Sequence, residues 1–340
     1  MREVARAAGV SPMTVSYTYS QPDRVSADAA ARVHAAAQAL GYPGPHPTAR
    51  SLRRGRVGTL GVVLGERLTY AFDDPQAARF LAGVADVCAS SGVGLTLLPT
   101  TGAASDVERV AQAVVDGFVV WTTSDDDPVL DAVADTGLPA VVHAGPEHRG
   151  LPVVGIDDRA AARAVGRVAF EGARRPLVLG FPLDRNRERR LLSGATVREV
   201  RFPVTRHRWE GLLEAWTEQG RPAGELSLAA CTGNDAVEGE QVAHELLTGA
   251  EPPDAIAAMS DELALGALRA AAGAGLAVPD DVAVTGWDDS DAAAPAGLTT
   301  VAQSLREQGA RCAQLVLSGG DVVPERWEVV VRTSTRSTIH

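Results

Sequence analysis

Short apolar runs alternate with amphipathic stretches from residue 57 to the end of the chain. In order, the runs are VGTLGVVL, VGLTLL, GFVVW, PAVVHA, PVVGI, PLVLG, DAIAAM and DVAVTGW. Continuous apolar strands separated by helices are typical of parallel sheets that helices cover on both faces. About 280 residues with this pattern exceed what one compact sheet usually takes, so we expect two α/β lobes.

The start of the chain has a different pattern, which predicts three short helices. The segment REVARAAG ends at Gly9, and glycine suits the left-handed position after a helix. Ser11 is a good N-cap and Pro12 a good first helical residue, so a second helix begins almost at once. A third helix is predicted from Ser26 to Gly41. Two helices joined by a short turn with glycine have the spacing of a helix-turn-helix.

The segment YPGPHPT, residues 42–48, has three prolines and cannot form a packed helix, so we place a domain boundary there. Residues 1–56 carry eight arginines and three acidic residues, a net charge of +5, whereas the whole chain has a net charge of −11. A basic head on an acidic body is expected to contact a polyanion while the body repels it.

Residue content excludes several classes of function. All 32 basic residues are arginines, and a chain without lysine has no Walker A loop and no Schiff-base chemistry. No apolar run approaches the length of a membrane span, and the first residues lack the apolar core of a secretory signal. Cys88, Cys231 and Cys312 fit buried free thiols better than disulfides or a zinc site. We expect a cytoplasmic, nucleoid-associated protein that is not an enzyme and needs neither cofactor nor metal.

Several motifs follow one another in a fixed order. They are VARAAGVSPMTVSYTYSQPDRVSADAAARVHAAAQALGY, ARSLRRGRVGTLGVVL, PDAIAAMSDELALGALRAAAGAGLAVPDDVAVTGWDDSD, LTTV and RTSTRST. Together they resemble the LacI/GalR (lactose-repressor/galactose-repressor) family of bacterial transcription factors over nearly the whole chain. The resemblance implies a homodimeric transcriptional regulator, usually a repressor, whose partners are a near-palindromic double-stranded DNA operator and a small-molecule effector such as a sugar.

The resemblance also implies a domain organisation and an α/β fold class. The expected parts are an all-α helix-turn-helix head at residues 1–43, a linker and hinge helix at 44–56, and a periplasmic-binding-protein-like body with parallel sheets at 57–340. We expect the first lobe of the body at about 57–150 and 288–315, and the second lobe at about 151–287 and 316–340.

The second helix of a helix-turn-helix places its N-terminal side chains against base edges in the major groove. By resemblance, the base-reading residues are Pro12, Met13 and Tyr17, and those closer to phosphates are Ser11, Thr14 and Ser16, with Arg24 as a further DNA contact. Tyr17 stands where the family pattern TVSR has arginine. A tyrosine offers one hydroxyl and a ring in place of two parallel hydrogen bonds to guanine, so we expect an unusual operator. The alternative is a small alanine-rich bundle that docks on the body.

The segment ARSL matches the hinge helix of the family, whose leucine enters the minor groove. The matching residue is Leu52, and such an apolar wedge kinks the duplex. Arg50, Arg53 and Arg54 would then contact phosphates or the floor of the groove. A solvated linker with one incidental leucine is the alternative.

The effector site is expected between the lobes. By resemblance, Arg208 grips an effector hydroxyl or carboxylate, Asp288 accepts hydroxyls, and Ser260 stands where asparagine is usual. Tyr70 and Phe72 are candidates for ring stacking, and core packing is an equally open alternative for both. The arginine-dense segment 184–201 matches no family motif, and we expect a solvated, mobile insertion there, with a dimer or DNA contact as alternatives.

Two other functions stay open at this point. The body of a DNA-binding regulator could have lost small-molecule sensing and respond to a protein partner. A solute-binding receptor without DNA activity is the other alternative, although the basic head favours a regulator.

Overall fold

The computed structural model describes residues 1–44, 56–194, 196–197 and 200–336. It divides into two compact units, Met1–Gly58 and Thr59–His340, which we call the head and the body. The predicted hinge contacts Arg50, Leu52, Arg53 and Arg54 lie outside the described residues.

The head is a bundle of three helices. They are α1 (Arg2–Ala8), α2 (Pro12–Ser20) and α3 (Ala27–Ala39), with the 3-10 turn η1 (Pro22–Arg24) before α3. Gly9 ends α1 with φ 64°, and the Ser11 hydroxyl accepts a hydrogen bond from the Thr14 amide at 3.0 Å. Val15 and Val33 are completely buried between the helices. The predicted glycine turn and N-cap are thus confirmed.

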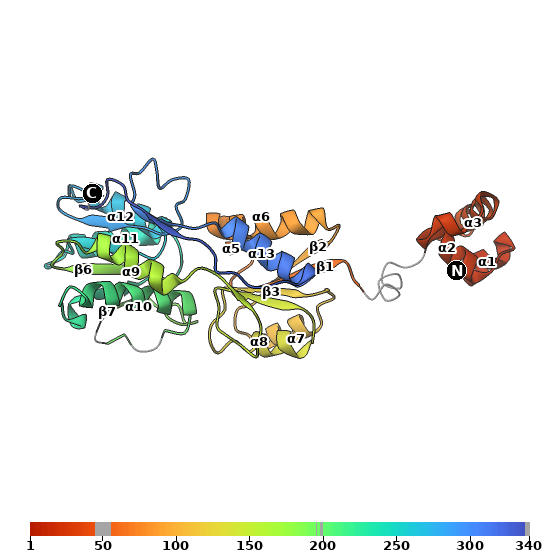
Figure 1. Ribbon diagram of the computed structural model, residues 1–340, viewed down its shortest axis with the longest axis horizontal. Helices are drawn as coiled ribbons and strands as arrows, with labels where there is room; N and C mark the ends of the chain where they lie inside the picture. The colour runs from red at the N-terminus through yellow and green to blue at the C-terminus, as the bar shows by residue number, and fades with distance from the viewer. Residues whose placement is uncertain (45–55, 195, 198–199, 337–340) are drawn as a thin grey trace. The chain divides into compact units, whose positions relative to one another are not determined.

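The first lobe of the body contains a parallel five-stranded sheet in the order β2-β1-β3-β4-β5. Its strands are β1 (Thr59–Leu64), β2 (Gly94–Pro99), β3 (Phe118–Trp121), β4 (Ala140–His143) and β5 (Val153–Val154). The helices are α5 (Tyr70–Asp73), α6 (Pro75–Ser90), α7 (Ala104–Ala111), α8 (Val129–Asp135) and α13 (Leu305–Ser318). Helices α6 and α13 cover one face of the sheet, and α7 and α8 cover the other (Figure 1).

The second lobe has another five-stranded sheet, in the order β10-β9-β6-β8-β7. Its strands are β6 (Pro176–Gly180), β7 (Arg190–Ser193), β8 (Ser227–Ala230), β9 (Ala255–Ala258) and β10 (Ala283–Thr285). The helical segments are α9 (Asp158–Ala169), α10 (Pro203–Thr217), η2 (Ala223–Glu225), α11 (Ala236–Leu247) and α12 (Asp261–Gly273). One apolar cluster joins α9 and α10 to the sheet, and a second joins α11 and α12 to its other face. The predicted two-lobed fold with parallel sheets is confirmed.

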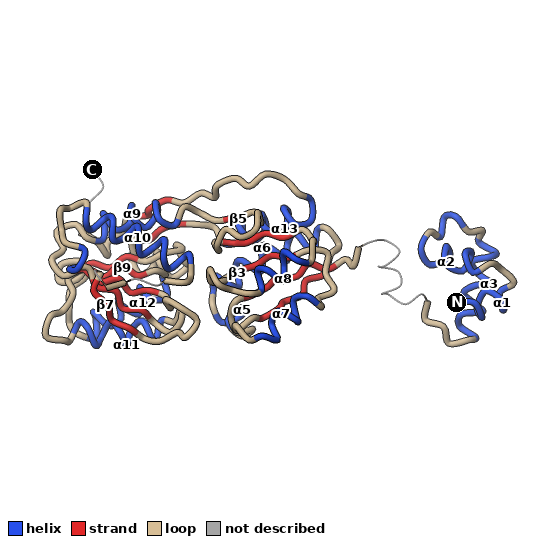
Figure 2. Tube along the Cα trace, turned by 90° about the horizontal axis from the view of Figure 1, so that it is seen from below, coloured by secondary structure: helices blue, strands red, loops and turns tan. Residues whose placement is uncertain are grey.

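The chain passes between the lobes after β5, after β11 (Thr300–Ala302) and before β12 (Glu328–Val330), and Figure 2 shows these connections in tan. Two of the predicted boundaries need correction. Strand β5 pairs with β4, so the first lobe reaches past residue 150 to Val154. Residues 288–302 stay with the second lobe, because Ala293 and Leu298 are buried in its core.

The arginine-dense segment 184–201 is not a free insertion. Strand β7 lies within it and pairs antiparallel with β8, at the edge of the second sheet. The expectation of a solvated, mobile insertion is therefore wrong for the described part of this segment, whose backbone forms regular hydrogen bonds to a buried strand.

The first lobe is completed by a helix from near the end of the chain, which two glycines allow to pack closely. A Cβ atom on Gly83 of α6 would lie 1.9 Å from the Arg306 carbonyl oxygen, and one on Gly309 of α13 would lie 2.1 Å from the Phe80 carbonyl oxygen. The helix backbones therefore touch, and this contact fixes the position of the α13 side chains that face the second lobe.

Replacing Gly309 by alanine should destabilise the body by about 1–3 kcal/mol, because the added methyl group overpacks a rigid backbone contact. Urea denaturation followed by circular dichroism measures this loss. Gly273→Ala is the control, since its Cβ would meet no atom within 4 Å. Equal stability of the two variants would contradict the close-contact explanation.

Candidate functional site

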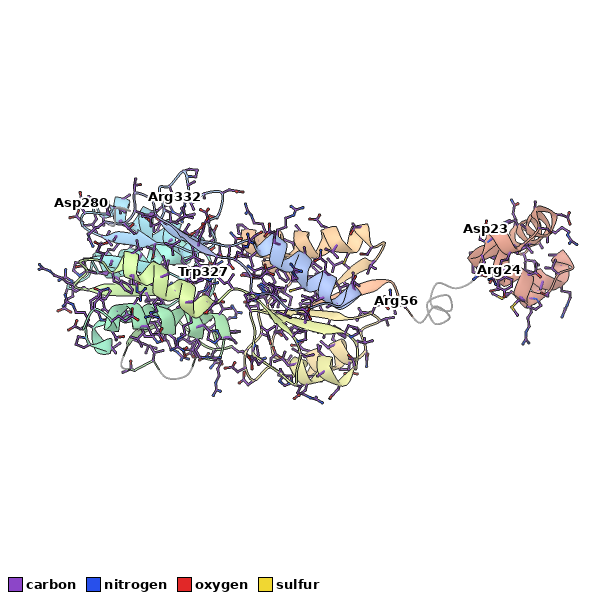
Figure 3. The ribbon with its side chains drawn as sticks, viewed as in Figure 1. Asp23, Arg24, Arg56, Asp280, Trp327 and Arg332 are labelled. Atoms are coloured by element: carbon purple, nitrogen blue, oxygen red, sulfur yellow. The ribbon has the colours of Figure 1, made fainter. Side chains whose placement is uncertain are left out.

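The N-terminal end of α2 presents a compact set of exposed groups. Ser11 and Pro12 are exposed, and 62% of the Met13 surface is accessible. Tyr17 is half-buried, and the guanidinium carbon of Arg24 lies 5.9 Å from the centre of its ring. Figure 3 labels Arg24 beside Asp23 in the turn after α2. An apolar side chain, a ring and a cation thus share one end of the helix.

Ser16 does not belong to this exposed set. Only 5% of its surface is accessible, and it follows the completely buried Val15. Thr14, two residues closer to the helix start, is half-buried, and its hydroxyl lies 2.9 Å from that of Ser11. The burial of Ser16 counts against the predicted phosphate contact, because its position on α2 turns it toward the interior of the head.

The body contains a cavity between its lobes, at the carboxyl ends of strands from both sheets. It measures about 970 Å³ with its open mouth included. The aromatic side chains that line it are Tyr70, Trp121, Phe181 and Phe202. Loops beyond the carboxyl ends of parallel strands are the usual ligand sites of α/β proteins.

Arg208, a predicted effector contact, lines this cavity from α10. Its Nε donates to Asp158 Oδ1 at 2.8 Å, and its Nη1 donates to the Met259 carbonyl at 2.5 Å. The guanidinium lies 4.0 Å from the ring centre of Trp287, so it stacks on the indole. Both members of the ion pair are buried, with 7% of each side chain accessible. The cation is therefore held rigidly at the cavity.

Asp288 also lines the cavity, as predicted, just beyond β10. Its backbone φ is 102°, a value that residues other than glycine rarely adopt. Burial raises the pKa of this carboxyl well above its usual value, although the nearby Arg208 lowers it. Strained backbone and a buried carboxyl are features that cluster at functional sites.

Asp74 reaches the second lobe from the start of α6. Its Oδ1 accepts from the Ala77 amide at 2.7 Å as the N-cap, and its Oδ2 accepts from Asn234 Nδ2 at 2.6 Å. Ser260 donates to Asn234 Oδ1 at 2.6 Å and caps α12. Ser260 is thus one step behind the cavity, where it positions Asn234, and it is not itself a lining residue.

Of the two predicted stacking residues, only Tyr70 lines the cavity. Phe72 is 71% exposed and is not among the lining residues, so the structure does not place it at the cavity where an effector contact was predicted. Residues 70 and 72 both lie in the single turn of α5, and positions two apart on a helix point about 200° apart. Phe181 and Phe202, which the sequence analysis did not name, supply the other phenyl rings.

The arginine-dense segment contributes ion pairs from the second lobe to the first. Arg185 Nη2 lies 2.7 Å from Asp127 Oδ2, and Arg187 pairs with Glu66, which lines the cavity. Farther along, the Arg206 guanidinium contacts Asp125. These pairs join the lobes beside the cavity, a role that the sequence pattern did not reveal.

Comparisons with known proteins agree with this arrangement. A profile for bacterial regulatory proteins of the lacI family matches residues 1–44, and one for the periplasmic binding protein-like domain matches residues 165–339. An HTH-type transcriptional regulator of Mycobacterium tuberculosis is 39% identical over 91% of this chain and 87% of its own. The chain belongs to the LacI family.

Other transcriptional regulators match along nearly their whole length. The regulator IpsA of Corynebacterium glutamicum is 33% identical over 98% of this chain and 95% of its own. A LacI-family regulator structure from the same species has a TM-score of 0.75 at 28% identity, with 98% of both chains covered. The protein is therefore a DNA-binding transcriptional regulator, not an enzyme, with a periplasmic-binding-protein-like body. Within its described residues, no helix is both long and apolar enough to cross a bilayer.

Arg208→Ala should destabilise the body by about 3–5 kcal/mol, because it leaves the buried Asp158 charge without its partner. Arg306→Ala is the control, since this arginine pairs with Asp86 on the surface, where an ion pair contributes below about 1 kcal/mol. Chemical denaturation of both variants measures the difference. Similar losses of stability in the two variants would show that the buried Arg208–Asp158 pair contributes no more than the exposed Arg306–Asp86 pair.

Asp288→Asn should gain stability relative to the wild type as the pH rises from about 4 to about 7. The pKa of the Asp288 carboxyl is higher in the folded state than in the unfolded state, so this group stabilises the wild type at a pH below its unfolded-state pKa. The wild type loses this contribution as the pH rises through the folded-state pKa. Asp291→Asn should show almost no trend over this range, because Arg79 lowers the pKa of that exposed carboxyl and its contribution is already complete above the unfolded-state pKa. Denaturation curves at several pH values provide the measurement, and a pH-independent difference for Asp288→Asn would contradict the prediction.

Proposed function

We propose that this regulator is a homodimeric repressor whose operator affinity is set by a small polyhydroxylated effector, such as a sugar, bound between the lobes. The observation that carries the proposal is the cavity itself, which both lobes line and in which Arg208 and Asp288 lie close together. A ligand that contacts both lobes favours one separation between them. The cavity therefore supports effector sensing by the body.

The chemistry of the lining residues favours a ligand with apolar ring faces and many hydroxyl groups. Aromatic rings such as Trp121 and Phe181 suit the ring faces, and carboxylates such as Asp74 and Asp288 accept from hydroxyls. The Arg208 guanidinium supplies donors at the same site. The sugar class is supported by the structure of a complex of the regulator CelR with cellobiose, which has a TM-score of 0.64 at 26% identity over 98% of both chains.

For the head, we propose that Pro12, Met13 and Tyr17 contact base edges, and that Ser11, Thr14 and Arg24 lie toward the phosphates. The exposed N-terminal end of α2 supports this assignment, since such an end enters the major groove in helix-turn-helix proteins. We keep Leu52 as the minor-groove wedge and Arg50, Arg53 and Arg54 as its flanking cations, on the resemblance of the ARSL segment.

Control of DNA binding then requires that the effector prefer one arrangement of the lobes. An effector shifts the equilibrium only by its difference in affinity for the two arrangements, typically about 1–3 kcal/mol. Ion pairs such as Arg187 with Glu66 would break or form as the lobes separate or close. The body thus has contacts whose free energy depends on the separation of the lobes.

The effector can be sought by thermal unfolding in the presence of glucose, ribose, cellobiose and adenosine. Chromatin immunoprecipitation supplies the operator, and the sugar that raises the unfolding temperature is then tested for its effect on operator binding. A sugar that binds and changes operator affinity supports the proposal. If the body binds none of these compounds, or binds them without altering operator affinity, the proposed effector class is wrong.

Met13→Ala should weaken operator binding about tenfold, through loss of one apolar base contact. The fold of the head should be unaffected, because Met13 is exposed. Fluorescence anisotropy with the mapped operator measures the affinity. Gln38→Ala, at an exposed position of α3, is the matched control. Equal affinities for both variants would remove Met13 from the base-reading set.

A further inference from the structure

A chain of hydrogen bonds runs from Asp288 in the second lobe to His143 in the first. Gln303 Nε2 donates to Asp288 Oδ1 at 2.7 Å, and Gln308 Nε2 donates to Gln303 Oε1 at 2.9 Å. The chain ends where Gln308 Oε1 lies 2.7 Å from His143 Nε2. We call Gln303 and Gln308 the relay, because each uses both ends of its amide.

The direction of the relay decides which nitrogen of His143 carries a proton. An amide has a donor end and an acceptor end, and a carboxyl oxygen that meets an N–H group must accept. With Gln303 Nε2 on Asp288, Gln303 Oε1 accepts from Gln308, and Gln308 Oε1 is left to face His143. His143 Nε2 must therefore donate. In a neutral imidazole, Nδ1 is then an acceptor without a proton.

The surroundings keep the His143 ring neutral. Its accessible fraction is 3%, and its ring centre lies 4.6 Å from that of Phe80. Burial lowers the pKa of His143 to about 4, because the effect of burial outweighs the opposing effect of the Gln308 hydrogen bond. Nδ1 is buried and has no hydrogen-bond partner within residues 1–44, 56–194, 196–197 and 200–336. Buried acceptors without a partner are rare, and each calls for an explanation.

The position of His143 offers that explanation. The residue lines the cavity together with Gln76 and Thr123. Gln76 Nε2 and Thr123 Oγ1 are likewise buried and unpaired in the described part of the chain. The first lobe therefore brings an acceptor, an amide donor and a hydroxyl to one side of the cavity, all without protein partners. A polar ligand in the cavity can satisfy such groups.

We propose that the relay makes His143 a specificity-determining residue, whose Nδ1 accepts a hydrogen bond from a hydroxyl or N–H group of the effector. This inference rests on the proposed effector cavity. An effector with only an acceptor, or with a deoxy carbon, at that place leaves Nδ1 unsatisfied and binds more weakly. Gln303 and Gln308 are positioning residues, because they act only by fixing the tautomer of His143.

The tautomer can be tested without any ligand. Nitrogen-15 NMR of the full-length protein at neutral pH distinguishes protonated from unprotonated ring nitrogens, and the His143→Gln spectrum identifies the His143 signals. We expect Nε2 protonated and Nδ1 unprotonated. Gln308→Met should shift both signals toward a mixture of tautomers, which a purely structural role of Gln308 would not do. A protonated Nδ1 in the wild type would overturn the proposal, whether or not sugars bind.

Two substitutions at His143 then test the acceptor itself. The probes are glucose, ribose and cellobiose, each compared with its available deoxy analogues by isothermal titration calorimetry. His143→Gln retains an amide that can reach Gln308 but places no acceptor where Nδ1 lies, whereas the Oδ1 of His143→Asn can take the place of Nδ1. For a sugar that binds, we expect about a tenfold loss in His143→Gln and a smaller loss in His143→Asn.

Each outcome bears on a different step. Equal losses in the two variants, or a Nδ1 signal that does not move when a sugar binds, would overturn the acceptor role. If the wild type binds none of the probes while Nε2 is protonated, the relay is supported and the sugar class of the proposed function fails. The two proposals can therefore fail separately.

Discussion

The backbone contact between α6 and α13 joins a helix near the start of the body to one near the end of the chain. Gly83 and Gly309 let these helices approach more closely than any side chain would allow. Because α13 belongs to the first lobe, the chain must return from the second lobe to reach it. That return brings Gln303, Leu305 and Gln308 to the cavity, where they meet residues of both lobes. The cavity proposed to bind the effector thus depends on how this one helix packs.

The ionisable groups of the body differ in their exposure to water, and their charges are balanced accordingly. On the surface, arginines pair with carboxylates, as Arg306 does with Asp86. In the cavity, Asp74 and Asp288 lie where burial raises the pKa of each carboxyl. The rigid Arg208 is held by Asp158 and by the face of Trp287. A preorganised cation beside buried carboxyls can recognise a polar ligand without reorganisation of the site.

Much of the fold could be predicted from local patterns, because its parallel strands are apolar and its helix starts carry caps. Each of the eight strand-like runs contains a strand, and Ser11 caps α2 as expected. Strand β8 was not predicted because Ser-Leu-Ala-Ala is short and no more apolar than a helix segment. Strand β7 was not predicted because it lies within an arginine-rich segment. Arg208 and Asp288 could be named from family motifs, and Tyr70 only as a nearby aromatic side chain. Asn234 and His143 could not be named, because their roles depend on partners far apart in sequence.

Both lobes depend on residues near the end of the chain. The first lobe contains α13. In the second lobe the Ser334 hydroxyl donates to the Val284 carbonyl at 2.6 Å, and Arg332, which Figure 3 labels, contacts Asp289 at 2.7 Å. During synthesis, neither lobe can complete its core until almost all of the body has left the ribosome. Among its described residues, the head has an apolar core built from α1, α2, α3 and their flanking residues, so it can fold before the body is complete. A nascent chain thus acquires its DNA-binding surface first, and the proposed effector cavity only once both lobes are complete.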